Sequence, residues 1–535
     1  MSKTKYLFYF IIFFFLFLLP GCVLNFAFES NTSNVIYEIF VRSFYDSNGD
    51  GIGDFSGIAR KVDYLVELGI DAVWLMPFNE AISYHGYDVV DYYTVEKDYG
   101  TMEDFEKMIG ILHENGIKII MDLVINHTSD KHPWFLDAIE NLDSSPYWNW
   151  YFMSLEDHSG KANWHYKFNS KGQKVWYFGL FGPSMPDLNH DNPYLRNEIK
   201  KIVKFWLNKG IDGFRLDAAK HIYGWTWDDG IEQSAEYWKW FRNYVFSIKK
   251  DAGLVGEVFS GDALQLEKFP IPVFNFVFRN MVVSNYEGAD SLLKMSLSWT
   301  NGRNNVPFLG NHDLNRILSV FQEYYKDFDK PDDSLKQSAL WHTLLLTISG
   351  TPVLYYGDEL GTPGFKWFGP VYDEPLREPF QWYASGTGKG QTKWTKWLYS
   401  DKKISFGNAN VDGCIYDDPY DGVSVEEQES ETYSMLNYIK TLINLRKRYK
   451  AFSIGDMEII ADKKNLIVYR RIFENEKFLV VINPSSTSAE YFEFPVGSSL
   501  VFKATLQNFT WEELREEISG IKLVNPREVI IIRLK

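Results

Sequence analysis

The sequence has few cysteines and fewer basic than acidic residues. Only Cys22 and Cys414 occur among its 535 residues, so a framework of disulfide bonds cannot hold the chain together. Acidic residues outnumber basic ones by 71 to 55, and the formal net charge is -16. This charge would repel a phosphate backbone, and the chain has no basic run of the kind that binds nucleic acid. The composition therefore predicts no nucleic-acid partner and favours a neutral or cationic one.

Aromatic residues are abundant instead. They make up 17% of the sequence, with 18 Trp and 33 Tyr, which is more than hydrophobic cores normally need. Their flat apolar faces suit stacking against sugar rings. The length and a hydrophobic content of 45% are enough for sizeable cores in several domains.

The N-terminus has the pattern of an export signal. Lys3 and Lys5 precede an almost unbroken apolar run over residues 6–19, as in a signal peptide. The run is shorter than the roughly 20 residues that a membrane-spanning helix needs. We therefore predict a signal peptide over residues 1–21 that is removed from the mature protein.

The residues that follow this run resemble a bacterial lipobox. Leu19-Pro20-Gly21-Cys22 places a cysteine where lipidation would make it the first mature residue, although Pro20 departs from the usual small residue. We predict lipidation of Cys22, a tether over residues 22–33, and a membrane-anchored lipoprotein of the bacterial cell envelope. Ordinary cleavage, which would release a secreted protein, is the alternative.

Short β-branched or apolar runs alternate with amphipathic stretches from Val35 onward, as in repeated βα units. Most of these runs are followed at once by polar residues. A (β/α)8 TIM barrel predicts this pattern because its active site is built at the carboxyl ends of the strands; an open doubly wound sheet is the alternative. Seven strands are predicted, over residues 35–40, 72–75, 118–123, 213–216, 254–258, 306–309 and 352–356.

Other segments interrupt or follow the barrel pattern. Residues 127–190 are rich in Trp, Tyr, Asn and Ser and predict a small inserted domain B after the third strand. A long loop is predicted over residues 383–422 and a closing helix over 434–449. Alternating strands beyond Gly455 predict a C-terminal antiparallel β-sandwich. The predicted domains are the barrel over residues 34–126 and 191–450, domain B over 127–190, and the sandwich over 451–535.

Carboxyl groups stand at the ends of three predicted strands. Asp217 follows Gly213-Phe214-Arg215-Leu216, Glu257 follows Leu254-Val255-Gly256, and Asp313 lies just beyond Val306-Leu309. In a barrel all three would meet at the catalytic rim. Cleavage of a glycosidic bond with retention needs two carboxyl groups roughly 5 to 5.5 Å apart, one as nucleophile and one as acid. These residues could supply that pair.

Four sequence blocks make a family resemblance specific. They are Asp122-Leu123-Val124-Ile125-Asn126-His127, residues 213–221, Gly256-Glu257-Val258-Phe259, and Phe308-Leu309-Gly310-Asn311-His312-Asp313. In this order they resemble the blocks of the α-amylase family of glycoside hydrolases, and Met185-Pro186-Asp187-Leu188-Asn189 resembles a further block in its inserted domain. The resemblance covers nearly the whole chain after the signal segment.

This resemblance implies the roles of the carboxyl groups. Asp217 would be the nucleophile and Glu257 the acid/base, while Asp313 would stabilise the distorted, positively charged sugar. Arg215 lies two residues before Asp217 on the same face of its strand, so its charge could hold Asp217 ionised and oriented. Glu257 needs apolar, partly desolvated surroundings that raise its pKa.

The resemblance also implies the substrate-binding residues. His127 and His312 would hydrogen-bond sugar hydroxyls, and Tyr87 would be a stacking platform for a sugar ring. Lys220 and His221 accompany, within the family, enzymes that grip α-1,4-glucan chains on the leaving-group side.

The length of the preferred substrate stays open. Exo-acting α-glucosidases of the oligosaccharide-cleaving branch usually have an acidic residue where this chain has Tyr84, which favours endo action here. Residues 46–54 and 377–382 nevertheless resemble that branch. The expected activity is endo-hydrolysis of α-1,4-glucosidic bonds in starch, glycogen or maltooligosaccharides. A 4-α-glucanotransferase, an α-glucosidase or cyclomaltodextrinase-like enzyme, and a non-catalytic glucan-binding lipoprotein are the alternatives.

One loop has the composition of a calcium site. Residues 46–54 place side-chain oxygens at alternate positions, and their glycines allow the chain to wrap tightly around a hard cation. Related enzymes of the family bind Ca²⁺ at this place. The implied ligands are Asp46, Asn48, Asp50, Asp54 and the carbonyl oxygen of Ile52; a glycine-rich turn without metal is the alternative.

Overall fold

The computed structural model describes residues 35–284, 305–326, 332–367, 369, 371–396, 418–460 and 465–535. The predicted signal peptide, Cys22 and the tether lie outside these residues, as does part of the predicted 383–422 loop. No helix within the described ranges is long and apolar enough to cross a membrane.

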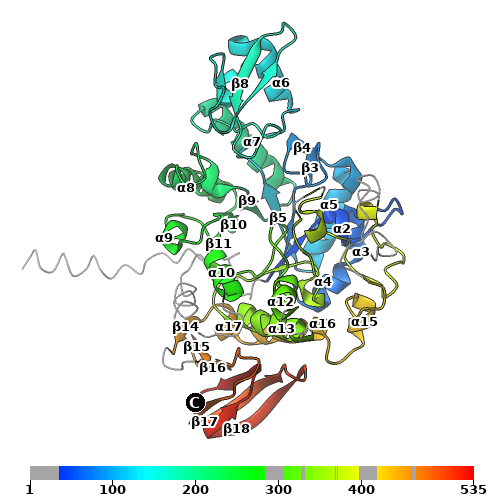
Figure 1. Ribbon diagram of the computed structural model, residues 1–535, viewed down its shortest axis with the longest axis vertical. Helices are drawn as coiled ribbons and strands as arrows, with labels where there is room; N and C mark the ends of the chain where they lie inside the picture. The colour runs from blue at the N-terminus through cyan, green and yellow to red at the C-terminus, as the bar shows by residue number, and fades with distance from the viewer. Residues whose placement is uncertain are drawn as a thin grey trace, which may run out of the picture.

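Eight parallel strands form the centre of the molecule (Figure 1), in the order β12-β11-β10-β9-β5-β2-β1-β13. A parallel bridge between Phe308, just beyond β12, and Val353 of β13 joins the two ends of this sheet. The sheet is therefore a closed barrel, which confirms the predicted (β/α)8 fold and excludes the open doubly wound sheet. The strands are β1 (Ile36–Ile39), β2 (Ala72–Leu75), β5 (Lys118–Leu123), β9 (Gly213–Leu216), β10 (Gly253–Gly256), β11 (Val273–Phe274), β12 (Asn305–Val306) and β13 (Val353–Tyr355).

The sixth strand, β11, is missing from the seven that the sequence predicts. It has only two residues, which is too short for an alternating or continuous apolar pattern to be recognised. The other seven strands lie where the sequence predicts them, within two residues at their ends except for β12, which ends at Val306, three residues before the predicted end.

Strand alternation divides the barrel residues between two cores, because successive side chains point to opposite faces. The inner core gathers Ile36, Ala72, Trp74, Ile120, Val255, Phe274, Phe276, Val306, Phe308 and Val353. Their neighbours in sequence, such as Tyr37, Val73 and Ile119, belong to the outer core beneath the helices. The barrel is thus filled by side chains, and a ligand can reach it only at its ends.

Helices surround the barrel and cover the outer faces of its strands (Figure 1). Ser434 caps α16 by accepting a hydrogen bond from the N–H of Asn437 at 3.2 Å, so the predicted closing helix begins where its sequence indicates. The principal helices are α3 (Phe55–Arg60), α4 (Val62–Leu68), α5 (Met102–Glu114), α7 (Pro193–Asn208), α8 (Ile231–Ile248), α10 (Phe276–Ser284), α12 (Ile317–Lys326), α13 (Asp332–Thr347) and α16 (Met435–Arg448).

A three-stranded antiparallel sheet follows β5 and stands beyond one end of the barrel (Figure 1). Its strands run in the order β6-β8-β7, over Met153–Ser154 (β6), Trp164–Phe168 (β7) and Lys174–Phe178 (β8), and helix α6 (Pro133–Asn141) packs beside them. These elements all fall within the 127–190 segment.

The C-terminal residues form an antiparallel sheet of six strands in the order β14-β15-β16-β19-β17-β18. One face packs against the barrel helices, and the other encloses a separate core that includes Val468, Leu479, Phe492 and Ile532. The antiparallel strands of the predicted C-terminal sandwich are confirmed, and they form one six-stranded sheet. Its strands are β14 (Asp456–Ile459), β15 (Ile467–Phe473), β16 (Glu476–Ile482), β17 (Glu490–Thr505), β18 (Thr510–Val524) and β19 (Glu528–Arg533).

Candidate active site

Charged side chains continue the inner core at the carboxyl ends of the barrel strands. Glu38 follows Ile36 by two residues, Asp122 follows Ile120, and Glu257 follows Val255, so each shares the inward face of its strand. Arg215 lies opposite Asp122 in the paired strands β5 and β9. The barrel therefore changes from an apolar filling to a charged one at the end where barrel enzymes bind substrate.

Arg215 is the centre of this charged layer. Its side chain is 1% exposed. Nη1 donates to Asp217 Oδ1 at 2.7 Å and to both oxygens of Asp122 at 2.9 and 3.0 Å, while Nη2 lies 2.8 Å from Glu257 Oε2. One cation thus bridges two of the three carboxyl groups that the sequence singles out, Asp217 and Glu257, and also Asp122, to which the sequence assigns no role. Asp122 also accepts hydrogen bonds from Trp74 and Tyr87.

Three carboxyl groups around one guanidinium cannot all ionise without leaving net charge in a buried site. Burial raises the pKa of Asp122 to about 7, against the lowering effect of Arg215. Burial also raises the pKa of Glu257, which is the direction that the sequence analysis predicts for an acid catalyst. The pKa of Asp217 is raised as well, because burial outweighs Arg215. The expected ion pair is present, but Arg215 shares its charge among three groups.

Asp313 has the opposite electrostatic environment. Its carboxylate accepts from His312 Nε2 at 3.0 Å and from Arg377 Nη2 at 3.1 Å, and His312 Nδ1 bonds to Glu38 on its other side. Burial opposes ionisation of Asp313, but the charges of His312 and Arg377 lower its pKa well below the ordinary range. Burial also lowers the pKa of His312, but Asp313 and Glu38 raise it to about 10. Asp313 is therefore a carboxylate held between two cations.

The structure brings Tyr87, His127 and His312 to the same rim. The ring of Tyr87 stacks on His312, with 5.4 Å between centroids and 17° between planes. His127 bonds through Nε2 to the carbonyl oxygen of Tyr87 at 3.0 Å and through Nδ1 to Asn126 at 3.1 Å. Burial lowers the pKa of His127 to about 4, so it is neutral at pH 7. Contacts of these histidines with sugar hydroxyls stay predictions. A sugar hydroxyl would have to replace one of the hydrogen bonds that their ring nitrogens make within the protein, such as that of His127 to Tyr87.

Arg377 links Asp313 to Asp373, a contact that was not predicted from the sequence. Arg377 Nη2 donates to Asp373 Oδ2 at 2.6 Å as well as to Asp313. Tyr84 donates to Asp373 and stacks on Trp394, with centroids 5.3 Å apart. Asp373 and Arg377 flank the short helix η6 (Glu374–Leu376), a single turn with no longer periodic pattern around it, so only the folded chain shows that they act together.

Asp217 is followed by a strained residue. Ala218 adopts left-handed backbone with φ 45° and ψ 38°, a conformation that costs a residue with a Cβ about 1–2 kcal/mol. The turn directs the Ala218 N–H to Glu257 Oε2 at 3.1 Å. Strain of this kind persists where the surroundings enforce it, often at functional sites. Here it fixes the strand end of Asp217 to Glu257.

Lys220 and His221 lie in the short helix η4 (Ala219–His221), directly after this turn. Both side chains are buried. Lys220 Nζ lies 3.5 Å from Asp228 Oδ1, and burial together with the charge of Lys220 lowers the pKa of His221 to about 4. The structure therefore places both residues beside Asp217, and their role in gripping a chain stays a prediction.

The predicted calcium loop is folded around its own backbone. Asp46 Oδ1 accepts from the N–H groups of Asn48 and Gly49 at 3.0 and 2.6 Å, Asp50 Oδ1 accepts from Ile52 at 2.8 Å, and Asp54 caps α3. Among the residues that the structure describes, no three His, Cys, Asp or Glu side chains gather into a group that could hold a metal ion. The predicted metal ligands are all oxygen atoms, which Ca²⁺ prefers. Calcium binding therefore stays a prediction.

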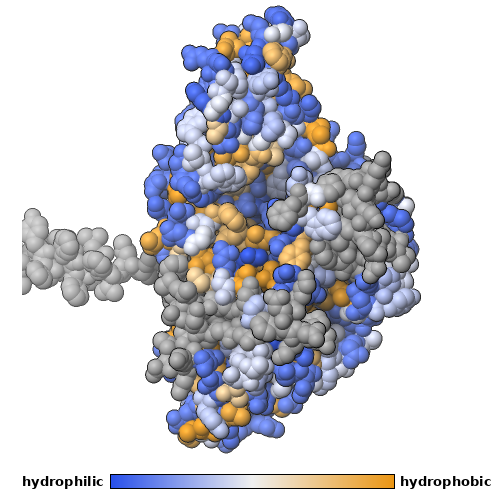
Figure 2. Space-filling model, viewed as in Figure 1, coloured by the Kyte–Doolittle hydropathy of each residue, from blue (hydrophilic) through white to orange (hydrophobic). Residues whose placement is uncertain are grey.

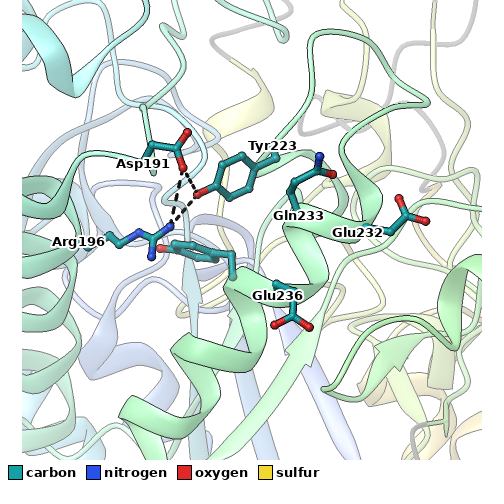
Figure 3. Close-up of a pocket in the computed structure, with 7 residues that line it drawn as sticks. Asp191, Arg196, Tyr223, Glu232, Gln233 and Glu236 are labelled. Atoms are coloured by element: carbon teal, nitrogen blue, oxygen red, sulfur yellow. Dashed lines mark hydrogen bonds and ion pairs between the residues drawn. The ribbon is translucent and has the colours of Figure 1, made fainter.

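A separate pocket of about 380 Å³ lies between the start of α7 and the start of α8. Figure 3 shows Tyr223 and Arg196 joined to Asp191 on one side and Glu232, Gln233 and Glu236 of α8 on the other. Tyr223 donates to Asp191 at 2.8 Å, and Glu232 pairs with Lys268. Its lining contains none of the predicted catalytic residues, so it is distinct from the rim.

A closed (β/α)8 barrel with carboxyl groups gathered around one arginine at the carboxyl ends of its strands has the architecture of a glycoside hydrolase. Comparison with known proteins agrees. The family model described as alpha amylase, catalytic domain, matches residues 38–455. The chain belongs to the α-amylase family.

Relatives within the family differ in their named activities. Over 461 residues the chain is 39% identical to alpha-amylase 3 of Dictyoglomus thermophilum, covering 84% of each chain. Over 484 residues it is 34% identical to a 4-alpha-glucanotransferase of Thermotoga maritima, covering 85% of this chain and 97% of that one. The crystal structure of the alpha-amylase from H. orenii superposes with a TM-score of 0.76 at 32% identity, covering 94% of this chain and 100% of that one.

Proposed function

We propose that the protein hydrolyses internal α-1,4-glucosidic bonds of glucans with retention of configuration. The observation that carries this proposal is the bridge that Arg215 makes between Asp217 and Glu257. Because one guanidinium contacts both carboxyl groups, they face the same small space at the end of the barrel. A nucleophile and an acid in one such space are what double displacement at a sugar requires.

In the first step Asp217 Oδ attacks the anomeric carbon while Glu257 gives its proton to the glycosidic oxygen. The bond to the leaving sugar breaks, and a covalent glycosyl ester forms on Asp217. In the second step Glu257, now a carboxylate, takes a proton from water, and the water oxygen displaces Asp217 from the anomeric carbon. Asp313 stays ionised between His312 and Arg377 and stabilises the positive charge that develops on the sugar.

The electrostatics of the site support this division of roles. Burial raises the pKa of Glu257, which favours the protonated form that the first step needs. Asp217 receives the 2.7 Å hydrogen bond from Arg215 Nη1, which favours its ionised form against the opposing effect of burial. The shared guanidinium couples the two groups, so a proton on Glu257 leaves more of the arginine's charge for Asp217.

Endo action on chains longer than a disaccharide is supported by two features. Tyr84 stands where exo-acting relatives carry an acidic residue, and its hydroxyl is engaged by Asp373 and Arg377. The relative from Dictyoglomus thermophilum is named an alpha-amylase. A 4-α-glucanotransferase is the second candidate, favoured by the relative from Thermotoga maritima. It would use the same glycosyl ester and pass the sugar to another glucan in place of water.

The test is product analysis with purified protein and maltoheptaose. Hydrolysis predicts only products shorter than seven units, together with turnover of a chromogenic maltooligosaccharide. Products longer than the starting sugar, dominant at low substrate concentration, would assign the transferase. No turnover of either substrate would reject both enzymes and leave a glucan-binding lipoprotein.

Two further proposals concern a metal ion and a lipid anchor. Asp46, Asn48, Asp50, Asp54 and the Ile52 carbonyl oxygen would hold a Ca²⁺ ion, which would cross-link the loop after β1 and stabilise the fold. Cys22 would carry a lipid that anchors the enzyme to the outside of the bacterial cell membrane, which would keep released sugars near their importers.

A further inference from the structure

Glu38 is a buried carboxyl group to which the proposed reaction gives no role. It lies on β1, two residues after Ile36 of the inner core, and its side chain is 0% exposed. Oε1 lies 2.5 Å from His312 Nδ1, while Oε2 has no hydrogen-bond partner in the part of the chain that the structure describes. Burying a charge is costly unless the charge is paired. His312 is therefore the partner on which an ionised Glu38 depends.

The ring of His312 has a carboxyl group at each nitrogen. Nδ1 faces Glu38, and Nε2 lies 3.0 Å from Asp313 Oδ2. The hydroxyl of Tyr87 lies 2.5 Å from the same Nε2 and donates its own proton to Asp122 at 3.1 Å, so the Tyr87 oxygen accepts from His312. The His312 ring is buried, and water has no access to either nitrogen.

Only a doubly protonated ring satisfies both contacts. Neutral imidazole carries one N–H and one lone pair. A proton on Nδ1 alone would turn the Nε2 lone pair toward Asp313, and a proton on Nε2 alone would turn the Nδ1 lone pair toward Glu38. An imidazolium donates to both carboxylates. The electrostatics act in the same direction, because the charges of Asp313 and Glu38 raise the pKa of His312 to about 10 against the lowering effect of burial.

Other ionisable groups face the ring or its acids, but within the described residues Glu38 alone contacts Nδ1. Arg377 Nε donates to the backbone carbonyl oxygen of His312 at 3.0 Å, and its charge is shared by Asp313 and Asp373. These facing groups are Tyr87, Asp122, Asp217, Tyr355, Asp358 and Arg377. Glu38 is therefore the group whose removal changes the ring's second proton most directly.

We propose that Glu38 is a positioning residue that keeps His312 doubly protonated, so that the imidazolium holds Asp313 ionised at the sugar-binding end of the barrel. The catalytic consequence of this inference rests on the proposed function. The surface is hollowed between the inserted domain and the barrel (Figure 2), and the Asp313 side chain is 39% exposed, whereas Glu38 is buried. Glu38 thus acts on a sugar only through His312 and Asp313.

Glu38→Gln removes the charge and nearly keeps the shape of the side chain. An opposite charge at hydrogen-bond distance raises the pKa of a histidine by about 1–3 pH units, so His312 in this variant should lose its second proton at a pH lower by about that much. Below this pH the ring is still an imidazolium, and Asp313 keeps its cation. Above it the ring is neutral and Asp313 loses that support. The variant should therefore fail only toward alkaline pH.

The first measurement follows the two ring nitrogens of His312 by NMR in protein labelled with nitrogen-15 histidine. His312→Asn identifies the signal among the 10 histidines. In wild type both nitrogens should stay protonated from pH 5 to pH 9, and in Glu38→Gln one proton should be lost about 1–3 pH units earlier. Glu38→Asp, which keeps the charge, should lose it later than Glu38→Gln does.

Glu359→Gln is the matched control for this measurement. Glu359 is a buried carboxyl group that accepts hydrogen bonds from the hydroxyls of Tyr37 and Tyr64 at 2.5 and 2.7 Å. Its replacement removes a buried carboxyl group from the same end of the barrel without touching His312. The His312 signal in this variant should titrate as in wild type.

The second measurement is the pH dependence of kcat/KM for α-maltosyl fluoride, whose leaving group departs without an acid, so deprotonation of Glu257 does not limit it. Wild type and Glu38→Gln should agree within about 3-fold at pH 5. Toward pH 9 the variant should fall on the order of 10-fold below wild type, with a midpoint where its His312 signal titrates. Such a midpoint separates a positioning role from a structural one, which would lower the rate equally at every pH.

A wild-type His312 that carries a single ring proton between pH 5 and pH 9 would overturn the inference, as would identical titrations in wild type and Glu38→Gln. If Glu38→Gln does not fold, the spectra of wild type and Glu38→Asp decide in its place. A rate loss in Glu38→Gln that is equal at every pH would also reject the positioning role. The expected spectra with an inactive wild type would count against the proposed function alone, because the protons on His312 are observed without turnover.

Discussion

Asp122→Asn should stabilise the protein at alkaline pH and leave its stability unchanged in acid. The Asp122 carboxyl is fully buried and shares the single cation Arg215 with Asp217 and Glu257. Burial raises its pKa from the ordinary 3.8 to about 7. The protonated carboxyl and an amide have nearly the same shape and are both neutral, so below pH 4 the two proteins should unfold alike.

The sign follows from proton binding. Between pH 4 and pH 7 the folded protein holds a proton on Asp122 that the unfolded chain has released, so wild-type stability falls as the pH rises through this window. Each pH unit costs about 1.4 kcal/mol for one group, which over the window gives at most about 4 kcal/mol. The Asp122→Asn protein does not lose this stability, and Arg215 becomes freer to pair with Asp217 and Glu257.

The assay is the free energy of unfolding from urea titrations between pH 4 and pH 8. The difference between the Asp122→Asn protein and wild type should grow with pH in favour of the variant and level off above pH 7. Asp143→Asn, at a carboxyl on the surface of the inserted domain, is the control and should give a flat difference. A difference that is flat, or that favours wild type more as the pH rises, would refute this reading of the Arg215 cluster.

Further expectations concern catalysis, calcium and location. Asp217→Asn and Glu257→Gln should each lower glucan hydrolysis by about three or more orders of magnitude while leaving the fold intact, because each removes one step of the displacement; near wild-type rates in either would contradict the roles. Chelation should lower the melting temperature of wild type, because an ion bound only by the folded state adds about 2.7 kcal/mol at a hundredfold excess over Kd. Asp50→Ala should remove this response, and an unchanged wild-type melting temperature would reject the site. A fatty-acid analogue should label cells that express wild type and not Cys22→Ser; unlabelled wild type found free in the medium would show simple secretion.

The barrel could be predicted because most of its strands can be recognised from a short local pattern of apolar residues. Residues 119–123 and 213–216 are mainly apolar and contain one charged residue each, and polar residues follow soon after both runs. β11 was not predictable, because a strand of two residues is held by its neighbours Gly256 and Asn305 across the sheet and not by its own sequence pattern.

The carboxyl groups at the strand ends could also be predicted from the sequence, but the charged neighbours that shift their pKa values could not. Glu38 and Asp122 stand inside apolar runs, two residues after inward-facing Ile36 and Ile120, and this signal could have identified them. The sharing of Arg215 among three acids depends on distances between strands β5, β9 and β10. Likewise Asp373 meets Tyr84 only because loops almost 300 residues apart converge on the rim.

Hydrolysis with retention requires Asp217 to form a covalent bond to the sugar. The most direct test incubates the Glu257→Gln protein with α-maltosyl fluoride, whose leaving group needs no acid, and then analyses the digested protein by mass spectrometry. We expect one maltosyl unit on the peptide that contains Asp217, because Glu257 is no longer present to activate water. The addition should be absent when Asp217→Asn is combined with Glu257→Gln. A maltosyl unit on another residue, or fluoride release from the Glu257→Gln protein with no sugar attached to it, would show that Asp217 is not the nucleophile.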